Sequence, residues 1–223
     1  MGFTVQLFGV IALADYEGSS EQIAFMTCKL EELAKKAKLS RTPELCISNG
    51  ERFASVDVFR NRISIGGHLV SMWQQGRFSD EDVEATLAHE IGHLMDFRRD
   101  SHSSSFRNML CESLWFSFGI FPLVFYLLAP SFTSFLVSGL IAVGWGSSLP
   151  WVVRRVEVRI ELEADRNAGL HLVEPQHLAN ALVKISSFSL STGGLGLTAK
   201  LAISASMLTH PSFVDRVRFL QSL

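Results

Sequence analysis

The strongest constraint on the fold is a long uncharged stretch in the middle of the chain. Residues 113 to 153 contain no Asp, Glu, Lys or Arg, and Pro130-Ser131 divides them into limbs at 113–129 and 132–153. A helix needs about 20 apolar residues to cross a bilayer, so the second limb is long enough and the first is at the short limit. The stretch therefore predicts an inserted transmembrane helical hairpin.

The composition agrees with a membrane protein. Hydrophobic residues make up 48% of the 223 residues and charged residues only 19%. This length indicates one domain, residues 1–223, with the hairpin as an insertion. The formal net charge of −2 gives no reason to expect a nucleic acid partner. Nothing in the composition indicates an oligomeric state. The cysteines, which have neither CxxC spacing nor an even number, predict neither a disulfide framework nor a cysteine zinc site; they are Cys28, Cys46 and Cys111.

A metal-binding motif precedes the uncharged stretch. The sequence Ala88-His89-Glu90-Ile91-Gly92-His93 contains the pattern HExxH within a helical segment. Helical spacing puts His89 and His93 one turn apart on the same face, where both imidazoles can bind one Zn²⁺. Glu90 can then act as general base toward a water molecule.

The sequence also predicts where this helix begins and which of its faces is buried. Ser79 is a good N-cap with Asp82 three residues later, and acidic residues fill the first turn, where the helix dipole favours negative charge. Apolar residues recur at helical spacing and predict a buried stripe. That stripe consists of Val83, Leu87, Ile91 and Leu94. The glycine within the motif, Gly92, suggests that another group approaches closely there.

A second motif follows the uncharged stretch and offers the third metal ligand. Glu161 and Asp165 lie one turn apart on a second predicted helix, so both carboxylates can face the first. One can bind the metal while the other accepts a hydrogen bond from a ligating imidazole. Spacing alone leaves Glu161 and Glu163 open as the ligand.

The metal motifs also constrain the topology. If His93 and Glu161 bind the same ion, the chain must return to the side of the membrane that it left, which requires an even number of crossings. Arginines flank the uncharged stretch at both ends, whereas the turn between the limbs has no charge. The positive-inside rule therefore predicts an integral membrane protein, in the inner membrane if the host is bacterial, with the zinc site facing the cytoplasm.

The order of these motifs resembles a known family. HExxH, a hydrophobic insert, Glu-x-x-Ala-Asp and a late Thr209-His210-Pro211 with Arg216 are similar to the membrane gluzincins of the HtpX and CAAX prenyl endopeptidase type. The resemblance implies that His89, His93 and Glu161 bind one zinc ion per chain. It also implies that Glu90 is the general base, that Asp165 is hydrogen-bonded to a ligand and that His210 is a candidate donor to the oxyanion.

The predicted fold is α+β, a mainly helical zincin-like domain with a small sheet ahead of the HExxH helix. An amphipathic helix is predicted over 20–39, followed by short strands at 45–47, 53–59 and 62–65. Residues 3–14 predict either a buried strand or, by preference, a segment at the membrane interface. Further helices are predicted over 177–190, over 199–208 and from Ser212 or Phe213 onward.

The third strand is also a candidate for substrate binding. It ends in glycines, which let another backbone approach, so we expect it to be the edge strand along which an extended substrate lies. An ordinary half-buried strand is an equally supported alternative. The residues concerned are Ile63, Ser64, Ile65 and Gly66.

These features together predict a zinc-dependent membrane endopeptidase that acts on protein or peptide substrates beside a lipid bilayer. The resemblance implies misfolded or membrane proteins as substrates. Two alternatives are a regulatory protease of the antirepressor type and a non-catalytic membrane interaction protein with structural zinc. Glu90 argues against the latter, because a structural zinc site has no use for a general base.

Overall fold

The structure is a computed structural model that describes residues 10–11, 20–48, 53–99, 124, 127–128, 131–191 and 211–223. Within them the chain is mainly helical with one small mixed sheet, as the α+β prediction requires. The predicted helix over 199–208 and most of the predicted first limb, 113–129, lie outside the described residues.

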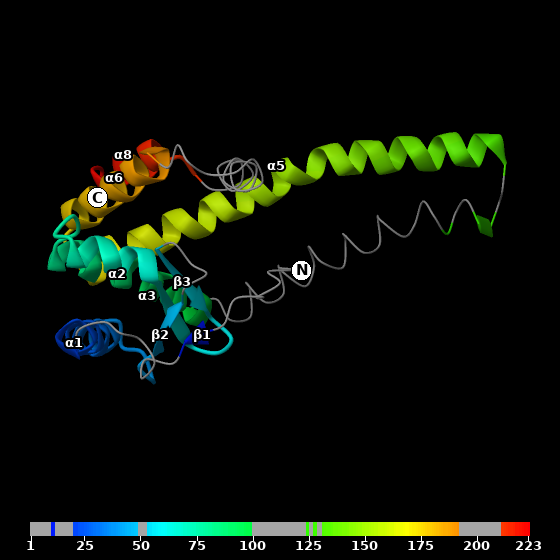
Figure 1. Ribbon diagram of the computed structural model, residues 1–223. Coiled ribbons are helices and arrows are strands. Elements are labelled where there is room, and N and C mark those ends of the chain that lie inside the picture. The colour runs from blue at the N-terminus through cyan, green and yellow to red at the C-terminus, as the bar shows by residue number, and fades with distance from the viewer. Residues whose placement is uncertain are drawn as a thin grey trace.

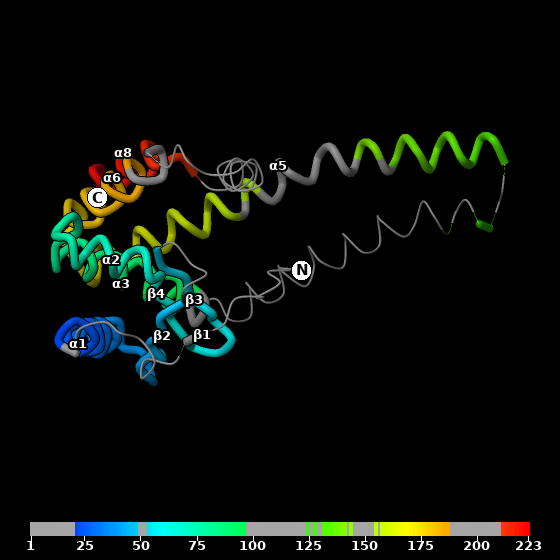
Figure 2. The backbone as a smooth tube through the Cα atoms, in the orientation of Figure 1, coloured from blue at the N-terminus to red at the C-terminus, as the bar shows by residue number. Residues whose placement is uncertain are grey.

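The sheet contains four short strands in the order β1-β2-β4-β3 (Figure 2). β2 (Glu44–Ser48) runs parallel to β4 (Arg62–Gly66), and β3 (Ala54–Asp57) pairs antiparallel with the other side of β4. β1 (Val10–Ile11) pairs antiparallel with β2. These two residues therefore form a strand rather than the membrane-interface segment that we preferred for this region.

The expectation that Ile63, Ser64, Ile65 and Gly66 form the edge strand is wrong. They belong to β4, which lies between β2 and β3, and both isoleucines are fully buried. The glycines that suggested an edge have another role, because Gly66 caps α2 (Gly67–Gln74) and the strand passes directly into that helix. The edge of the sheet on this side is β3.

α3 (Asp80–Arg99), the helix that carries HExxH, lies at the centre of the molecule. It contacts α1 (Ser20–Lys36), α5 (Phe132–His171), α6 (Pro175–Ser191) and β3, while α8 (Phe213–Leu220) packs on α5 and α6. The core between these elements is aliphatic. Its fully buried members include Met26, Leu30, Leu33, Ile47, Leu69, Leu87, Ile91 and Leu94.

The start of α3 is held by a capping box and an ion pair. The backbone N–H of Ser79 donates to the Asp82 carboxylate at 2.7 Å, and the Asp82 N–H donates to the Ser79 hydroxyl at 3.3 Å. Both bonds satisfy N–H groups that a helix end otherwise leaves open. Lys184 of α6 also pairs with Asp82, so the same carboxylate joins α6 to α3.

α3 and α5 approach so closely that only glycine fits between them. A Cβ at Gly92 would lie 2.3 Å from the carbonyl oxygen of Ala164. The close approach predicted for Gly92 is therefore the packing of the two helices that carry the metal motifs.

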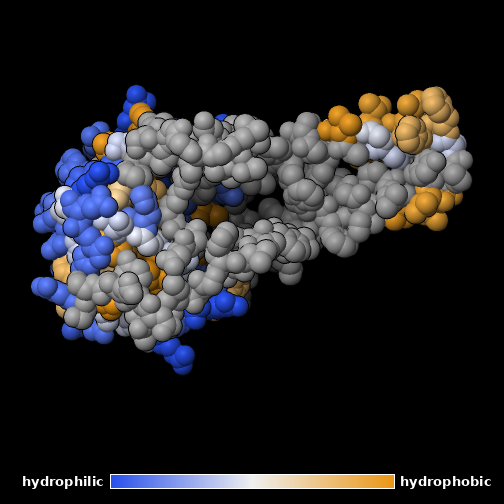
Figure 3. Space-filling view, viewed as in Figure 1, coloured by the Kyte–Doolittle hydropathy of each residue, from blue (hydrophilic) through white to orange (hydrophobic). Residues whose placement is uncertain are grey.

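α5 is a single helix of 40 residues, at 1.5 Å per residue about 60 Å long. It combines the predicted second limb with the predicted helix of Glu161, and it projects far beyond the body of the molecule (Figure 1). Large apolar side chains are exposed at its far end, which is orange in Figure 3. They include Phe132, Phe135, Leu136, Val137, Leu140, Ile141 and Val143.

The predicted transmembrane hairpin at 113–153 is not confirmed. Among the residues that the structure describes, no helix combines the length and the apolarity needed to cross a membrane.

Candidate metal centre

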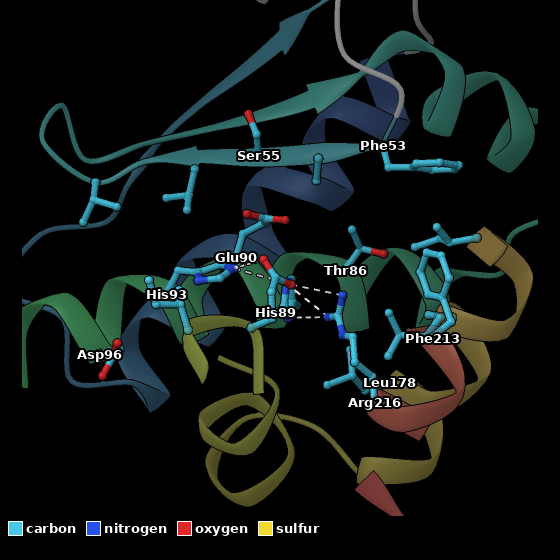
Figure 4. A pocket seen from close by; sticks show the side chains of 18 residues that line it. Phe53, Ser55, Thr86, His89, Glu90, His93, Asp96, Leu178, Phe213 and Arg216 are labelled. Carbon is cyan, nitrogen blue, oxygen red and sulfur yellow. Dashed lines mark hydrogen bonds and ion pairs between the residues drawn. The ribbon is translucent and has the colours of Figure 1, made fainter. Parts of the chain in front are cut away.

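Three ligand atoms converge where α3 crosses α5 (Figure 4). The Nε2 atoms of His89 and His93 lie 3.2 Å apart. The Glu161 carboxylate approaches them, with Oε2 at 3.4 Å from Nε2 of His89 and Oε1 at 3.7 Å from Nε2 of His93. His89, His93 and Glu161 therefore form a compact triangle of two nitrogens and one carboxylate.

This triangle fits zinc. Donors that bind Zn²⁺ tetrahedrally at about 2.0–2.1 Å lie about 3.3 Å from one another. The His89–His93 separation of 3.2 Å is close to that value, and the two oxygens of Glu161 lie 3.4 and 3.7 Å from one imidazole nitrogen each. All three side chains are partly accessible and line a cleft, as the ligands of a catalytic zinc site that admits water and substrate do.

A buried ion-pair network holds the ligands from behind. Nδ1 of His89 lies 2.9 Å from Oδ1 of Asp165, which is fully buried. This bond leaves Nε2 of His89 facing the triangle. Arg216 of α8 makes a bidentate pair with Asp165, at 2.7 Å for both bonds, and its Nη1 lies 3.1 Å from Oε2 of Glu161. One guanidinium therefore positions two carboxylates.

The pKa values of the two imidazoles are shifted in opposite directions. Burial lowers the pKa of both imidazoles, but hydrogen bonds to Asp165 and Glu161 outweigh burial and the charge of Arg216 at His89, whose pKa is raised to about 9. At His93 burial and the charge of His89 prevail, and the pKa is lowered to about 3. The hydrogen bond with Asp165 therefore distinguishes the pKa of His89 from that of His93.

The hydrogen bonds also set the charge of the groups behind the ligands. Burial alone would raise the pKa of Asp165, but its hydrogen bonds from His89 and Arg216 lower it. Burial would lower the pKa of Arg216, but the pairing with Asp165 raises it. Both groups therefore stay ionised.

Glu90 faces the pocket above the triangle. Its side chain extends from α3 toward β3 (Figure 4), into a cleft of about 640 Å³. The cleft has an apolar wall at the end beside Thr86, formed by α6, α8 and the residue before β3. That wall includes Phe53, Leu178, Leu182 and Phe213. Asp96 lies at the opposite end, beside His93 (Figure 4).

The roof of the cleft is the edge strand β3. Gly66 N–H donates to the carbonyl of Phe53, and the antiparallel register then pairs Ser55 with Ser64. Hydrogen-bonded and non-hydrogen-bonded positions alternate along such a pair, so the N–H and C=O groups of Ala54 and Val56 point away from β4. Both residues line the cleft.

Three other site predictions have different outcomes. Glu163 lies away from the triangle and pairs with Arg166 at 3.9 Å, which leaves Glu161 as the carboxylate in the cluster. His210 lies outside the described residues. Arg216 was quoted within the family pattern but given no role, because its burial and its acidic partners are visible only in the folded chain.

Comparison with known proteins agrees with the geometry. The profile of peptidase family M48 matches residues 21–223. The fold is similar to the crystal structure of S. mikatae Ste24p, with a TM-score of 0.58 and 20% sequence identity. That similarity covers 98% of this chain and 53% of Ste24p, so the chain spans about half the length of that protein. No curated protein matched. The family resemblance is therefore confirmed, and the chain belongs to peptidase family M48, whose members are zinc metallopeptidases.

Proposed function

We propose that the chain hydrolyses peptide bonds as a zinc-dependent endopeptidase. The observation that carries this proposal is the position of Glu90, which extends into the cleft between the His89-His93-Glu161 triangle and an edge strand. A carboxylate placed there meets both the attacking water and the scissile bond of an extended peptide.

Each residue of the site has its own role in the proposed reaction. Zinc held by the triangle would supply a Lewis acid that polarises the scissile carbonyl and lowers the pKa of water to about 7. Glu90 accepts the proton of the attacking water on a carboxylate oxygen and passes it to the leaving amine nitrogen. Asp165 and Arg216 keep His89 and Glu161 oriented, and His210 donates a hydrogen bond to the developing oxyanion.

The substrate adds to the sheet as an extended strand along β3. The outward N–H and C=O groups of Ala54 and Val56 supply main-chain hydrogen bonds, and the apolar wall beside Phe213 receives a side chain next to the scissile bond. Binding of this kind depends on the backbone of the substrate rather than on its sequence, which suits unfolded or misfolded protein substrates of the HtpX kind.

The apolar end of α5 supports membrane attachment. The uncharged stretch 113–153 and the exposed apolar side chains from Phe132 to Val143 leave a surface that water solvates poorly. We place this segment in a lipid bilayer as a helical hairpin, with the metal centre on the cytoplasmic side. A position at the membrane surface suits membrane proteins as substrates.

The proposal is tested by Glu90→Gln in detergent-purified protein, with Glu81→Gln, an exposed residue of the same helix, as control. We expect casein cleavage to fall by about 10³-fold in the first variant, with zinc content and folding unchanged. His210→Asn should lower kcat/KM by about 10²-fold with zinc retained. Undiminished cleavage by Glu90→Gln would refute the peptidase mechanism and favour a non-catalytic zinc protein.

A further inference from the structure

A second cleft, away from the metal centre, lies between α5 and the end of α8. Its volume is about 400 Å³. The side chains that line it are Arg155, Val158, Arg159, Leu162, Glu163, Arg166, Phe219 and Leu223. The six from α5 recur at intervals of three, four, seven, eight and eleven residues, which places them on one face of the helix. This face differs from the one that carries Glu161 and Asp165.

The charge of this cleft is opposite to that of the whole chain. Three arginines and one glutamate line it, whereas the chain has a formal net charge of −2. Glu163 lies 3.9 Å from Arg166 in an exposed pair. Arg155 and Arg159 lie one helical turn apart in the part of the lining that is nearer the uncharged stretch.

The side chains that line the cleft favour a phosphate diester as the ligand. Guanidinium groups present planar pairs of donors that match the oxygens of a phosphate. Val158, Leu162 and Phe219 add apolar surface to the same lining. Apolar surface of this kind can contact the arginine stems and the glycerol backbone of a lipid, whereas a free phosphate ion gains nothing from it.

The position of the cleft along α5 indicates that the phosphate belongs to a membrane lipid. The uncharged stretch ends at residue 153. At 1.5 Å per residue, Arg155 follows its end by about 3 Å and Arg159 by about 9 Å, whereas Arg166 follows it by about 20 Å. The headgroup layer of one leaflet is roughly 5–8 Å thick, so Arg155 lies at its depth and Arg159 at its outer limit.

We propose that this cleft, with Arg155 and Arg159 as its phosphate ligands, binds the headgroup of an anionic phospholipid. This inference rests on the proposed insertion of residues 113–153 into a bilayer. A bound headgroup would tether α5 and α8 to the membrane surface. Since Glu161 lies on α5 and Arg216 on α8, the tether would fix how the metal centre faces the bilayer.

The test uses native mass spectrometry of the full chain in detergent, titrated separately with phosphatidylglycerol, phosphatidylcholine and inorganic phosphate. The variant Arg155→Gln with Arg159→Gln is compared with Arg41→Gln and Arg77→Gln, which removes two exposed arginines elsewhere. Wild type and control should retain phosphatidylglycerol in preference to phosphatidylcholine. The cleft variant should bind phosphatidylglycerol about 30-fold more weakly, because the loss of each arginine should weaken binding roughly tenfold or less. Casein cleavage by every sample shows that each is folded.

Two outcomes would overturn the proposal. Equal retention of phosphatidylglycerol by the cleft variant would place lipid binding elsewhere, and displacement of the lipid by an equal concentration of inorganic phosphate would make the site one for free phosphate. Failure of the membrane proposal is distinguishable, because the wild-type chain would then stay soluble without detergent.

Discussion

Arg216 is the residue whose importance depends most on the folded state. It lies 51 positions from Asp165 along the chain, yet its guanidinium makes two hydrogen bonds of 2.7 Å to that buried carboxylate. No local pattern reveals such a pair. The histidines and Glu161 were predictable because one helical turn separates the two imidazoles and because the two motifs match a family pattern.

Arg216→Met should destabilise the protein, because Asp165 would keep its charge in a fully buried position with one partner fewer. We expect a loss on the order of 3 kcal/mol, or about 6–12 °C in Tm. Arg216→Lys should recover less than half, since a single ammonium cannot replace the bidentate pair. Thermal unfolding of these variants beside Arg218→Met, an exposed position on the same helix, measures the effect. An unchanged Tm for Arg216→Met would contradict it.

Gly92→Ala should separate the two halves of the metal centre. The new Cβ would lie 2.3 Å from the Ala164 carbonyl, so α5 would have to retreat from α3 by on the order of 1 Å and take Glu161 with it. A displacement of this size should lower casein cleavage about 100-fold. Gly139→Ala, where a Cβ meets nothing within 4 Å, is the matched control and should cleave normally. Equal activity of the two variants would show that the close approach is unimportant.

The strands and helices differ in how well the sequence predicts them. Short runs separated by Asn49-Gly50 and Arg60-Asn61 predicted β2, β3 and β4, and the Ser79 capping box predicted the start of α3. The order of the strands was not predictable, because the crossover that puts β4 beside β2 is a long-range pairing. α2 was also missed, since Gly66 and Gly67 were interpreted as the end of a strand that another backbone approaches, whereas Gly66 caps the helix.

The role of β3 as the substrate edge predicts a difference between neighbouring proline variants. Val56→Pro removes an N–H that points toward the cleft, whereas Ser55→Pro removes one that pairs with β4. Val56→Pro should therefore lower kcat/KM about 3- to 10-fold with little change in Tm. Ser55→Pro should lower Tm by several degrees. Steady-state cleavage and thermal unfolding on the same samples separate the two effects, and an unaltered kcat/KM for Val56→Pro would argue against strand addition at β3.

At the scale of the whole molecule, α5 connects a group of exposed apolar side chains to the metal centre. Its far end carries exposed apolar side chains, and its near end carries Glu161 and Asp165 into the metal centre. The sequence predicted both parts separately, because the uncharged stretch ends at Arg154 and the acidic motif follows. That they form one rigid helix depends on the folded backbone.

The proposed membrane attachment through the apolar end of α5 predicts how the chain fractionates. The wild type should stay with membranes through washes with high salt and alkaline carbonate. Leu136→Glu with Leu140→Glu should weaken the attachment, because a charge within the hydrocarbon layer costs up to about 3 kcal/mol. Gln176→Glu with Asn180→Glu adds two charges at the same spacing on an exposed face of α6 and should remain attached. Wild-type protein that is soluble without detergent would contradict the membrane assignment.

The central claim is that His89, His93 and Glu161 hold one catalytic zinc ion. The most direct measurement is the zinc content of detergent-purified wild type, Glu161→Ala and Glu163→Ala, with casein cleavage assayed on the same samples. We expect about one zinc per chain and full cleavage in the wild type and in Glu163→Ala, and the loss of both in Glu161→Ala. Zinc retained by Glu161→Ala, or absent from the wild type, would contradict the account.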